Sequence, residues 1–237
     1  MRRVLVPELM DNPGVPRAEL ESALSYIRFV NHRLGGSKAL VEHLKAWSRR
    51  WPRTRPITML DVGTGSADIP LAACAWARGA GFDLRVTALD LHETTLGVAR
   101  RHVAHEPAIT VVRGDALTLD AQFEPGSFDY AHAGMFLHHL TDARVEAVLR
   151  SMDRVSRAGL VWNDLVRSRF QLALLNLILI GQPRIVAHDA RVSVRAGFTR
   201  ADTEGMARRL GLTYLKHHHR GLWYRFTLAG EKEGAWS

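Results

Sequence analysis

Residues 59–70 read MLDVGTGSADIP. The first residues of this stretch are typical of a buried strand, and Pro70 suits the first turn of a helix. Between them, Gly63 and Gly65 allow a sharp turn and a close approach of a ligand to the backbone. The stretch therefore predicts a strand, a ligand-binding turn and a helix.

Two acidic side chains lie beside this turn. Asp61 precedes it, and Asp68 stands where the dinucleotide-binding pattern Gly-x-Gly-x-x-Gly has its third glycine. Carboxylates at these positions would repel a pyrophosphate and attract an ammonium group. The turn thus favours a nucleoside ligand with a positively charged tail and disfavours a nicotinamide-dependent oxidoreductase. A tight turn without any ligand is the structural alternative.

Short apolar runs alternate with helical stretches along the following part of the chain. This alternation is typical of a doubly wound α/β fold with a parallel sheet and right-handed crossovers. We expect strands at residues 57–62, 84–90, 109–113, 128–133 and 158–163, and helices at residues 69–79, 93–105 and 143–155.

Two more of these strands end in an acidic residue. Asp90 precedes Leu91 at the end of the second strand, and Asp115 precedes Ala116 after the third. The carboxyl ends of parallel strands lie at one edge of the sheet, where such folds bind ligands. Asp90 can accept hydrogen bonds from both hydroxyls of a ribose, and Asp115 can accept one from an adenine amino group. For each acid taken alone, a solvated strand end is the alternative.

The regions around this alternation form three further parts. Two helices separated at Gly35-Gly36 are expected within residues 19–50, and a hairpin is expected near Arg220-Gly221, after a helix that Thr199 caps and Gly211 ends. Residues 165–198 fit no strand position, and we expect them to form a lid. We expect the lid to contain a helix at 167–180 and a polar stretch at 186–191, and the hairpin strands to be 212–218 and 222–228. The chain is thus predicted to divide into a helical cap with linker (1–56) and a ligand-binding domain (57–237).

The motif DVGTG at residues 61–65, together with Asp90 and Asp115, resembles the class I S-adenosylmethionine-dependent methyltransferases. The resemblance covers about residues 19–230, although Ala67 stands where the family frequently has glycine. Residues 26–36 (YIRFVNHRLGG) and 136–140 (FLHHL) are similar to the branch of ubiquinone/menaquinone methyltransferases and natural-product small-molecule O-methyltransferases, and residues 163–168 (NDLVRS) are similar to bacterial methyltransferases that accompany polyketide-type biosynthesis.

This resemblance implies both a fold and an activity. The implied fold is a Rossmann-like, doubly wound sheet of seven strands, five parallel strands plus the C-terminal hairpin. The implied activity is methyl transfer from S-adenosyl-L-methionine to a small molecule, a phenolic or polyketide-type hydroxyl of secondary metabolism. By the same resemblance Asp61, Gly63 and Gly65 would hold the methionine end of the cofactor, Asp90 and Leu91 the ribose, and Asp115 and Ala116 the adenine.

Two residues are candidates for acid–base chemistry. A hydroxyl that accepts a methyl group must lose its proton, so a base within hydrogen-bond reach helps. His138 follows the fourth strand, and Asp164 ends the fifth strand across the same mouth, where it could orient an imidazole and stabilise its cation. We interpret His138 as the base, Asp164 as its partner and His139 as a spectator. A structural role for the two histidines at a helix start is the alternative.

Two other functions stay open at this stage. One is an RNA methyltransferase, and the other is a protein that binds S-adenosylmethionine without catalysis. Enzymes that methylate amino groups of bases resemble one another in an Asn/Asp-Pro-Pro-aromatic turn after the fourth strand. This chain has Ala133-Gly134-Met135-Phe136 at that place, which disfavours the first alternative.

The composition is that of a globular protein without a disulfide. The net charge of +8 comes from scattered basic residues and favours a solvated surface over a nucleic-acid-binding stripe. The most apolar run, residues 172–180, is about half of the ~20 residues that span a bilayer. We therefore expect a cytoplasmic protein that acts on a small-molecule substrate, with no membrane span and no metal. A homo-oligomer is left open.

Overall fold

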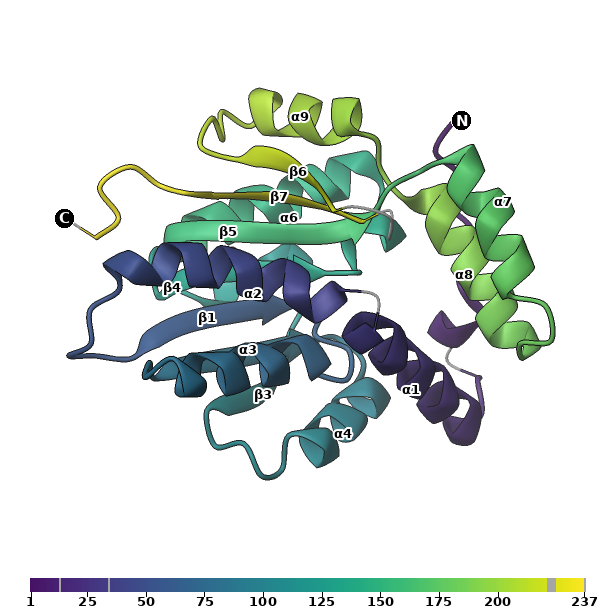
Figure 1. Ribbon diagram of the computed structural model, residues 1–237, viewed down its shortest axis with the longest axis horizontal. Coiled ribbons are helices and arrows are strands. Elements are labelled where there is room, and N and C mark those ends of the chain that lie inside the picture. Colours follow the sequence, from purple (N-terminus) through teal and green to yellow (C-terminus); the bar gives the residue numbers. More distant parts are fainter. Residues whose placement is uncertain (13, 34, 221–224, 237) are drawn as a thin grey trace.

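The computed structural model describes residues 1–12, 14–33, 35–220 and 225–236. At its centre lies a seven-stranded sheet in the order β3-β2-β1-β4-β5-β7-β6 (Figure 1). Strands β1 to β5 run parallel, and β7 runs antiparallel to both β5 and β6. The predicted Rossmann-like α/β fold with a C-terminal antiparallel pair is therefore confirmed. The strands are β1 (Ile57–Val62), β2 (Leu84–Asp90), β3 (Ile109–Arg113), β4 (Phe128–Gly134), β5 (Ser156–Leu165), β6 (Lys216–Arg220) and β7 (Arg225–Glu231).

Helices cover both faces of this sheet (Figure 1). The α-helices are α1 (Arg17–Arg33), α2 (Gly36–Trp47), α3 (Asp68–Gly79), α4 (Glu93–His102), α5 (Leu119–Gln122), α6 (Asp142–Val155), α7 (Arg169–Ile178), α8 (Arg184–Ala196) and α9 (Arg200–Arg209). The 3₁₀ turns are η1 (Leu9–Asp11), η2 (Ser48–Arg50), η3 (Ala116–Thr118) and η4 (Leu137–His139).

The core consists of two apolar layers, one on each face of the sheet. Met59 of β1 packs in the cluster that includes Leu44 of α2 and Ala73 of α3. The next residue, Leu60, packs in the opposite cluster with Leu149 of α6. Successive side chains of a strand point to opposite faces, and here helices cover both faces. This is why the central strands are buried along nearly their whole length instead of alternating between core and solvent.

An insertion between β5 and α9 lies over one end of the sheet, beside α1 (Figure 1). It consists of α7, α8 and the turn between them. Its two ends meet, because the Phe198 amide donates to the Leu165 carbonyl and the Arg167 amide donates to the Phe198 carbonyl, both at 2.9 Å. The insertion therefore leaves the sheet and returns to it at a single point.

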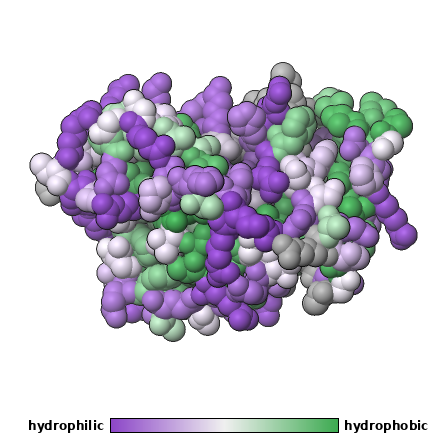
Figure 2. Space-filling model, turned by 90° about the horizontal axis from the view of Figure 1, so that it is seen from below, coloured by the Kyte–Doolittle hydropathy of each residue, from purple (hydrophilic) through white to green (hydrophobic). Residues whose placement is uncertain are grey.

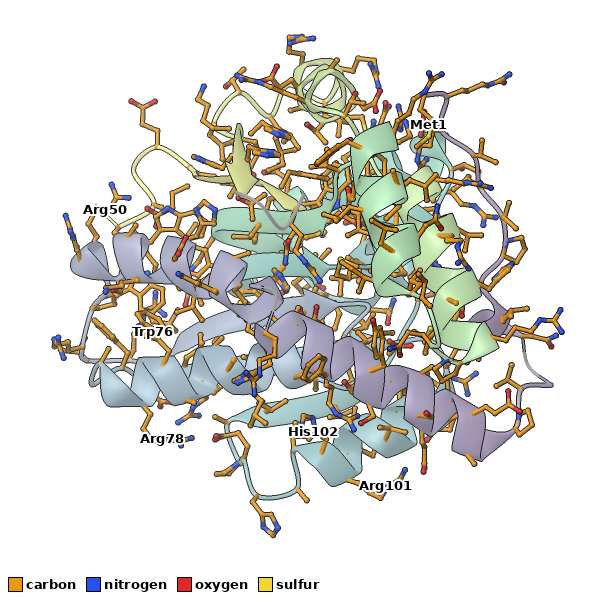
Figure 3. All side chains as sticks on the ribbon, turned by 45° about the vertical axis from the view of Figure 1, so that its right-hand side comes forward. Met1, Arg50, Trp76, Arg78, Arg101 and His102 are labelled. Carbon is orange, nitrogen blue, oxygen red and sulfur yellow. The ribbon has the colours of Figure 1, made fainter. Side chains whose placement is uncertain are left out.

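The N-terminal segment runs along this insertion. Figure 3 shows Met1 beside the beginning of α7, where the Arg167 side chain donates to the Met1 carbonyl. Further along, the backbone amides of Leu9 and Met10 donate to the Asp189 carboxylate of α8 at 2.7 and 3.1 Å. The first eleven residues thus form a strap, residues 1–11, that is held against α8.

Most of the expected elements form where the sequence predicts them. Strands β1, β2 and β3 have the predicted bounds, and Thr199 caps α9 with a complete capping box. The helix expected at 93–105 ends at His102, and the one expected at 167–180 covers 169–178. The polar stretch at 186–191, for which no helix was predicted, lies within α8. Its apolar residues occur at helical spacing and pack inward, with Val186, Val192 and Val194 buried.

Three further predictions concern the hairpin turn, the division of the chain and membrane spans. Residues 221–224, where the hairpin turn is predicted, lie outside the described residues. The division of the chain at residue 56 stays a prediction. Within the described part of the chain, no helix combines the length and the apolar character needed to cross a membrane.

Candidate active site

A cavity of about 680 Å³ opens at the carboxyl ends of the parallel strands. All of the residues predicted to bind the cofactor line it: Asp61, Gly63, Gly65, Asp90, Leu91, Asp115 and Ala116. The cavity continues past them to His138 and His139 and ends under α7 and α8. One continuous space therefore joins the glycine turn to the predicted base. Asp164 does not line this space, because it lies buried behind His138.

The glycine turn requires the residues it has. Gly63 has a φ of 68°, and a Cβ at this position would lie 2.4 Å from the Phe136 ring. Gly65 also has a positive φ, as does Ala67, which forms the N-cap of α3 in the left-handed region at φ 57°. Left-handed backbone is rare for alanine and costs energy, and such strain is concentrated at functional sites. The departure from the frequent glycine at residue 67 is thus accommodated without a change of conformation.

Asp90 fastens the turn to the end of β2. Its carboxylate accepts hydrogen bonds from the amides of Gly65, at 3.0 Å, and His92, at 3.1 Å. Burial, the strongest influence, raises the pKa of Asp90, while these two amides oppose the rise. Each carboxylate oxygen still has the capacity to accept a further hydrogen bond. Beside it, Leu91 exposes its side chain and offers an apolar surface.

Asp115 lies on the next wall of the same cavity. One of its oxygens accepts a hydrogen bond from the Leu117 amide at 2.9 Å and caps η3. Ala116, the first residue of η3, is buried beside it. The three acids at the ends of β1, β2 and β3 therefore border one space, as their positions in the sequence predict.

No pattern in the sequence indicates the group that contacts Asp61. The Asp61 carboxylate pairs with the Nδ1 of His132 in β4, and both side chains are buried. These two residues are direct neighbours in the register of β1 and β4. The Nε2 of His132 is buried and has no hydrogen-bond partner in the described structure. The charge of Asp61 thus faces a histidine on one side and the cavity on the other.

A second unforeseen group is Arg225, at the start of β7. Its Nη2 donates to the Asn31 side chain at 3.1 Å, and Asn31 in turn donates to the Asp68 carboxylate at 3.1 Å. The guanidinium lines the cavity and is buried, and its Nη1 has no hydrogen-bond partner in the described structure. Burial lowers the pKa of Arg225, although Asp164 and Asp68 attract the cation. A buried cation with an unused donor therefore lies near the acidic end of the glycine turn.

His138 and Asp164 form the predicted contact. The His138 Nδ1 lies 2.7 Å from one Asp164 oxygen, and the His138 amide donates to the other at 3.2 Å. Asp164 also accepts hydrogen bonds from Trp162 and from the amide of Leu165. Asp164 is fully buried, and its contact with Nδ1 orients the His138 ring from the side that faces away from the cavity.

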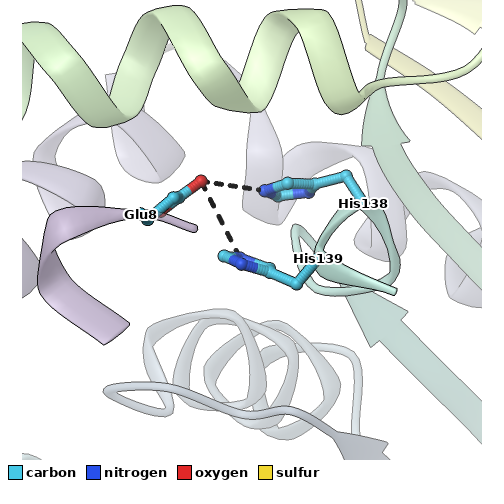
Figure 4. Close-up of side chains that lie close together, drawn as sticks. All are labelled: Glu8, His138 and His139. Carbon is cyan, nitrogen blue, oxygen red and sulfur yellow. Dashed lines mark ion pairs between the residues drawn. The ribbon is translucent and has the colours of Figure 1, made fainter. Parts of the chain in front are cut away.

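The strap adds a carboxylate that the sequence analysis missed. Glu8 lies 3.4 Å from the Nε2 of His138 and 3.9 Å from the Nε2 of His139 (Figure 4). It also accepts a hydrogen bond from Ser193 of α8. Glu8 is 7% exposed although it lies in a segment for which the sequence analysis places no helix or strand. No local pattern links it to a histidine 130 positions further on, and only the folded strap brings the two together.

The two carboxylates set the charge state of His138. Burial, the largest influence, lowers the pKa of His138, but the attraction and hydrogen bonds of Asp164 and Glu8 outweigh it and raise this pKa to about 10. Burial likewise raises the pKa of Glu8 and of Asp164, and in both the histidine contacts outweigh it and lower the pKa. In this arrangement His138 is an imidazolium between two carboxylates at neutral pH.

The cluster of Glu8, His138 and His139 also has the spacing of a cation site. Its donor atoms lie within 4.8 Å of one another. The ion pairs drawn in Figure 4 account for this arrangement with protons alone, so we assign no metal to it. The sequence-based expectation of a metal-free site stays a prediction.

Comparison with known proteins gives a match to one family and several similar folds. Residues 59–159 match a family described as a methyltransferase domain. A search of curated proteins gives no match. The fold is similar to the CurJ carbon methyltransferase, with a TM-score of 0.70 and 12% identity over 91% of this chain and 59% of that one. It is similar to the CMeT domain of the citrinin polyketide synthase, with a TM-score of 0.61 and 15% identity over 79% of this chain and 49% of that one.

A third similar structure has nearly the same length as this chain. Magnesium protoporphyrin IX methyltransferase from Synechocystis PCC 6803, solved with bound SAH, gives a TM-score of 0.59 at 13% identity over 94% of this chain and 91% of that one. By contrast, this chain spans about half of the structure with the CMeT domain and about three fifths of the CurJ carbon methyltransferase. The chain thus has a Rossmann-like fold with a segment that matches a methyltransferase domain, and S-adenosylmethionine is the cofactor that this match indicates.

Proposed function

We propose that this protein transfers a methyl group from S-adenosylmethionine to a hydroxyl of a small phenolic or polyketide-type molecule. The observation that carries the proposal is the continuous cavity that leads from the glycine turn to the buried pair of His138 and Asp164. When bound, S-adenosylmethionine supplies the methyl group and leaves as S-adenosylhomocysteine. A cavity covered by α7 and α8 favours a small acceptor, because a folded nucleic acid does not fit under them.

The residues of the cavity fit a zwitterionic tail at one end. Asp61 and Asp68 would face the ammonium group, and the unused Nη1 of Arg225 would donate to the carboxylate. Asn31 connects Asp68 and Arg225, so the spacing of the two charges is fixed by hydrogen bonds. This arrangement supports the electrostatic reasoning from the sequence and adds the positive partner that it lacked.

At the other end of the cofactor cavity, the nucleoside would lie between β2 and β3. Asp90 would accept from the ribose hydroxyls with the lone pairs that its own amide contacts leave free, and Leu91 would pack against the sugar. Asp115 would accept from the adenine amino group beside Ala116. These roles follow the resemblance that the sequence suggested, and they are proposals for this chain.

His138 would remove the proton of the acceptor hydroxyl. The hydroxyl would approach Nε2, the nitrogen that faces the cavity and that Glu8 now contacts. In the molecules whose His138 is unprotonated, the proton moves from the hydroxyl oxygen to Nε2, and Asp164 stabilises the resulting imidazolium through Nδ1. Bound S-adenosylmethionine, which Asp61, Asp90 and Asp115 would hold, would supply the methyl group to this oxygen and would be released as S-adenosylhomocysteine. Alignment in a site that excludes water contributes the rest of the acceleration.

We expect the Arg225→Gln variant to lower affinity for ligands that have the amino-acid tail of the cofactor and to leave affinity for the nucleoside part unchanged. Affinity for S-adenosylhomocysteine should fall about 10-fold, since a charge-assisted hydrogen bond to the carboxylate is lost. Affinity for 5′-methylthioadenosine, which lacks the amino-acid tail, should be unchanged. Titration calorimetry with both ligands measures the difference. An equal loss for both would mean that Arg225 acts through the fold and does not bind the tail.

The pH dependence of turnover should follow the charge of His138. A base must be unprotonated, and the pKa of His138 is raised to about 10, so turnover should fall as the pH drops below about 10. In Glu8→Gln one of the two anions is removed, so the pKa should fall and the acidic limb of the profile should move to lower pH. The profile of kcat against pH measures this shift.

A matched control makes the pH experiment specific. Glu146→Gln removes the same charge from α6, where Glu146 pairs with Arg209 away from the cavity. Its acidic limb should stay where the unaltered protein has it. If the limb of Glu8→Gln also stays in place, the titrating group is not His138.

The activity itself is tested with two measurements. Calorimetry should show binding of S-adenosylhomocysteine and no binding of NADH, and a labelled-methyl assay across phenolic polyketides should give a labelled product. Label attached to carbon in place of oxygen would overturn the hydroxyl assignment. A salt-dependent shift of RNA at low micromolar protein, with labelled RNA as product, would favour the RNA methyltransferase instead.

A further inference from the structure

The outer side of α7 carries large apolar side chains that face solvent. Leu174, Leu177 and Ile178 on the helix and Ile180 in the following turn are between 41% and 76% exposed. None of the residues of α7 itself is buried in the described structure. Figure 2 shows apolar side chains gathered at the end of the molecule where Figure 1 places α7 and α8. We call Leu174, Leu177, Ile178 and Ile180 the α7 patch.

The insertion that carries the α7 patch has an excess of positive charge. Residues 165–198 contain a single acid, Asp189, and five arginines: Arg167, Arg169, Arg184, Arg191 and Arg195. The acid is buried and accepts hydrogen bonds from the strap amides. Arg169 and Arg184 are exposed at the two ends of the α7 region. The surface of the insertion is therefore apolar and cationic, without an exposed carboxylate.

We propose that the α7 patch docks on the surface of an anionic lipid bilayer. Apolar residues flanked by arginines, on a helix too short to span, are the properties of a segment that lies in the interface between headgroups and acyl chains. The arginines would face the anionic headgroups, while Leu177 and Ile180, the most exposed residues of the patch, would enter the acyl boundary.

The adjoining side of the same helix connects this surface to the active site. Gln171, Leu175 and Ile178 line the cavity that contains His138, and Ile178 is at the same time more than half exposed. Thus α7 alone separates the proposed bilayer surface from the acceptor end of the cavity. Resting on the proposed methyl transfer, this placement implies an amphiphilic acceptor, a hydroxylated ring with an apolar tail, that enters from the bilayer beneath α7.

Charge favours a bilayer over a second copy of this chain as the occupant. Docking two copies through the α7 patch would bring two arginine-rich surfaces together without acids to oppose them, and like charges across an interface are unfavourable. The net charge of +8 likewise disfavours the association of two copies. An anionic bilayer supplies both the apolar volume and the negative charge that the surface lacks.

Co-sedimentation with vesicles tests the proposal. The protein should bind vesicles of phosphatidylglycerol and phosphatidylcholine, and bind vesicles of phosphatidylcholine alone much more weakly. Leu177→Asp and Ile180→Asp should each lower binding to the anionic vesicles about 10-fold, through loss of apolar burial and added negative charge. Both side chains are exposed, so neither substitution opens a cavity in the core. Leu177→Asn, which adds no charge, should also weaken binding.

Control measurements separate this proposal from the proposed activity. Thr54→Asp introduces the same charge in an exposed loop before β1, at the opposite end of the sheet, and should bind vesicles normally. Binding of S-adenosylhomocysteine and methylation of a soluble phenol should be unchanged in all four variants. Equal vesicle binding by Leu177→Asp and the unaltered protein would overturn the proposal. So would a dimer in light scattering that Leu177→Asp dissociates.

Discussion

Replacing His138 by alanine should lower turnover ~10²-fold or more, because the group that takes the proton from the acceptor is lost. Affinity for the cofactor should change little, since His138 lies at the acceptor end of the cavity. Single-turnover assays together with calorimetry for S-adenosylhomocysteine measure the two quantities. The effect should be largest near the pH optimum and should shrink with acceptors that are already ionised, which need no base.

A second variant separates catalysis from stability. Removing the imidazole leaves the buried Asp164 without its cation, which itself destabilises a fold. In His138→Asn the side-chain amide can still donate to Asp164 in place of Nδ1, while the nitrogen that faces the cavity is gone. This variant should unfold close to the temperature of the unaltered protein and still lose turnover. His139→Asn is the matched control and should keep most of its activity. Full turnover in His138→Asn would make the pair structural.

Asp90→Ala should weaken cofactor binding by about 1–3 kcal/mol, or about 5- to 150-fold. Two losses add up in this variant. The ribose hydroxyls lose their acceptor, and the amide of Gly65 loses the carboxylate that fastens the glycine turn to β2. Calorimetry with S-adenosylhomocysteine measures the affinity, and thermal unfolding measures what the turn itself contributes.

Two comparisons make the Asp90 result specific. Asp90→Asn keeps an oxygen that can accept from the Gly65 amide, so it should lose less affinity than Asp90→Ala. Asp83→Ala removes an acid that lies just before the same strand and whose carboxylate pairs with Arg85, and it should bind the cofactor normally. Unchanged affinity in Asp90→Ala would exclude Asp90 from the cofactor site.

The half of the site that binds the cofactor could be predicted because local pattern and topology determine it. Each acid follows its own strand in the sequence, and parallel strands bring their carboxyl ends to one edge. Asp61, Asp90 and Asp115 therefore had to meet once the strands were placed. The same reasoning brought Asp164 to the level of His138, since β4 and β5 are neighbours.

The other half of the site depends on contacts between distant parts of the chain. Arg225 reaches the cavity because β7 runs antiparallel beside β5, an order that no residue near it indicates. His132 contacts Asp61 through the register of β4 against β1. Glu8 reaches His138 only because Asp189, in a helix that was not predicted, holds the strap. Packing against α8 holds this N-terminal segment and buries Glu8, although most of the residues before Glu8 stay exposed.

The hydrogen bonds that join the two ends of the insertion have a consequence for how its sequence and length can change in evolution. Backbone hydrogen bonds join Leu165 and Arg167 to Phe198, so the residues between them form a cassette with one attachment point. A longer or shorter cassette leaves the register of β5 and the start of α9 as they are. Acceptor range can therefore change by exchange of this cassette, while the acids that would hold the methyl donor stay under separate selection.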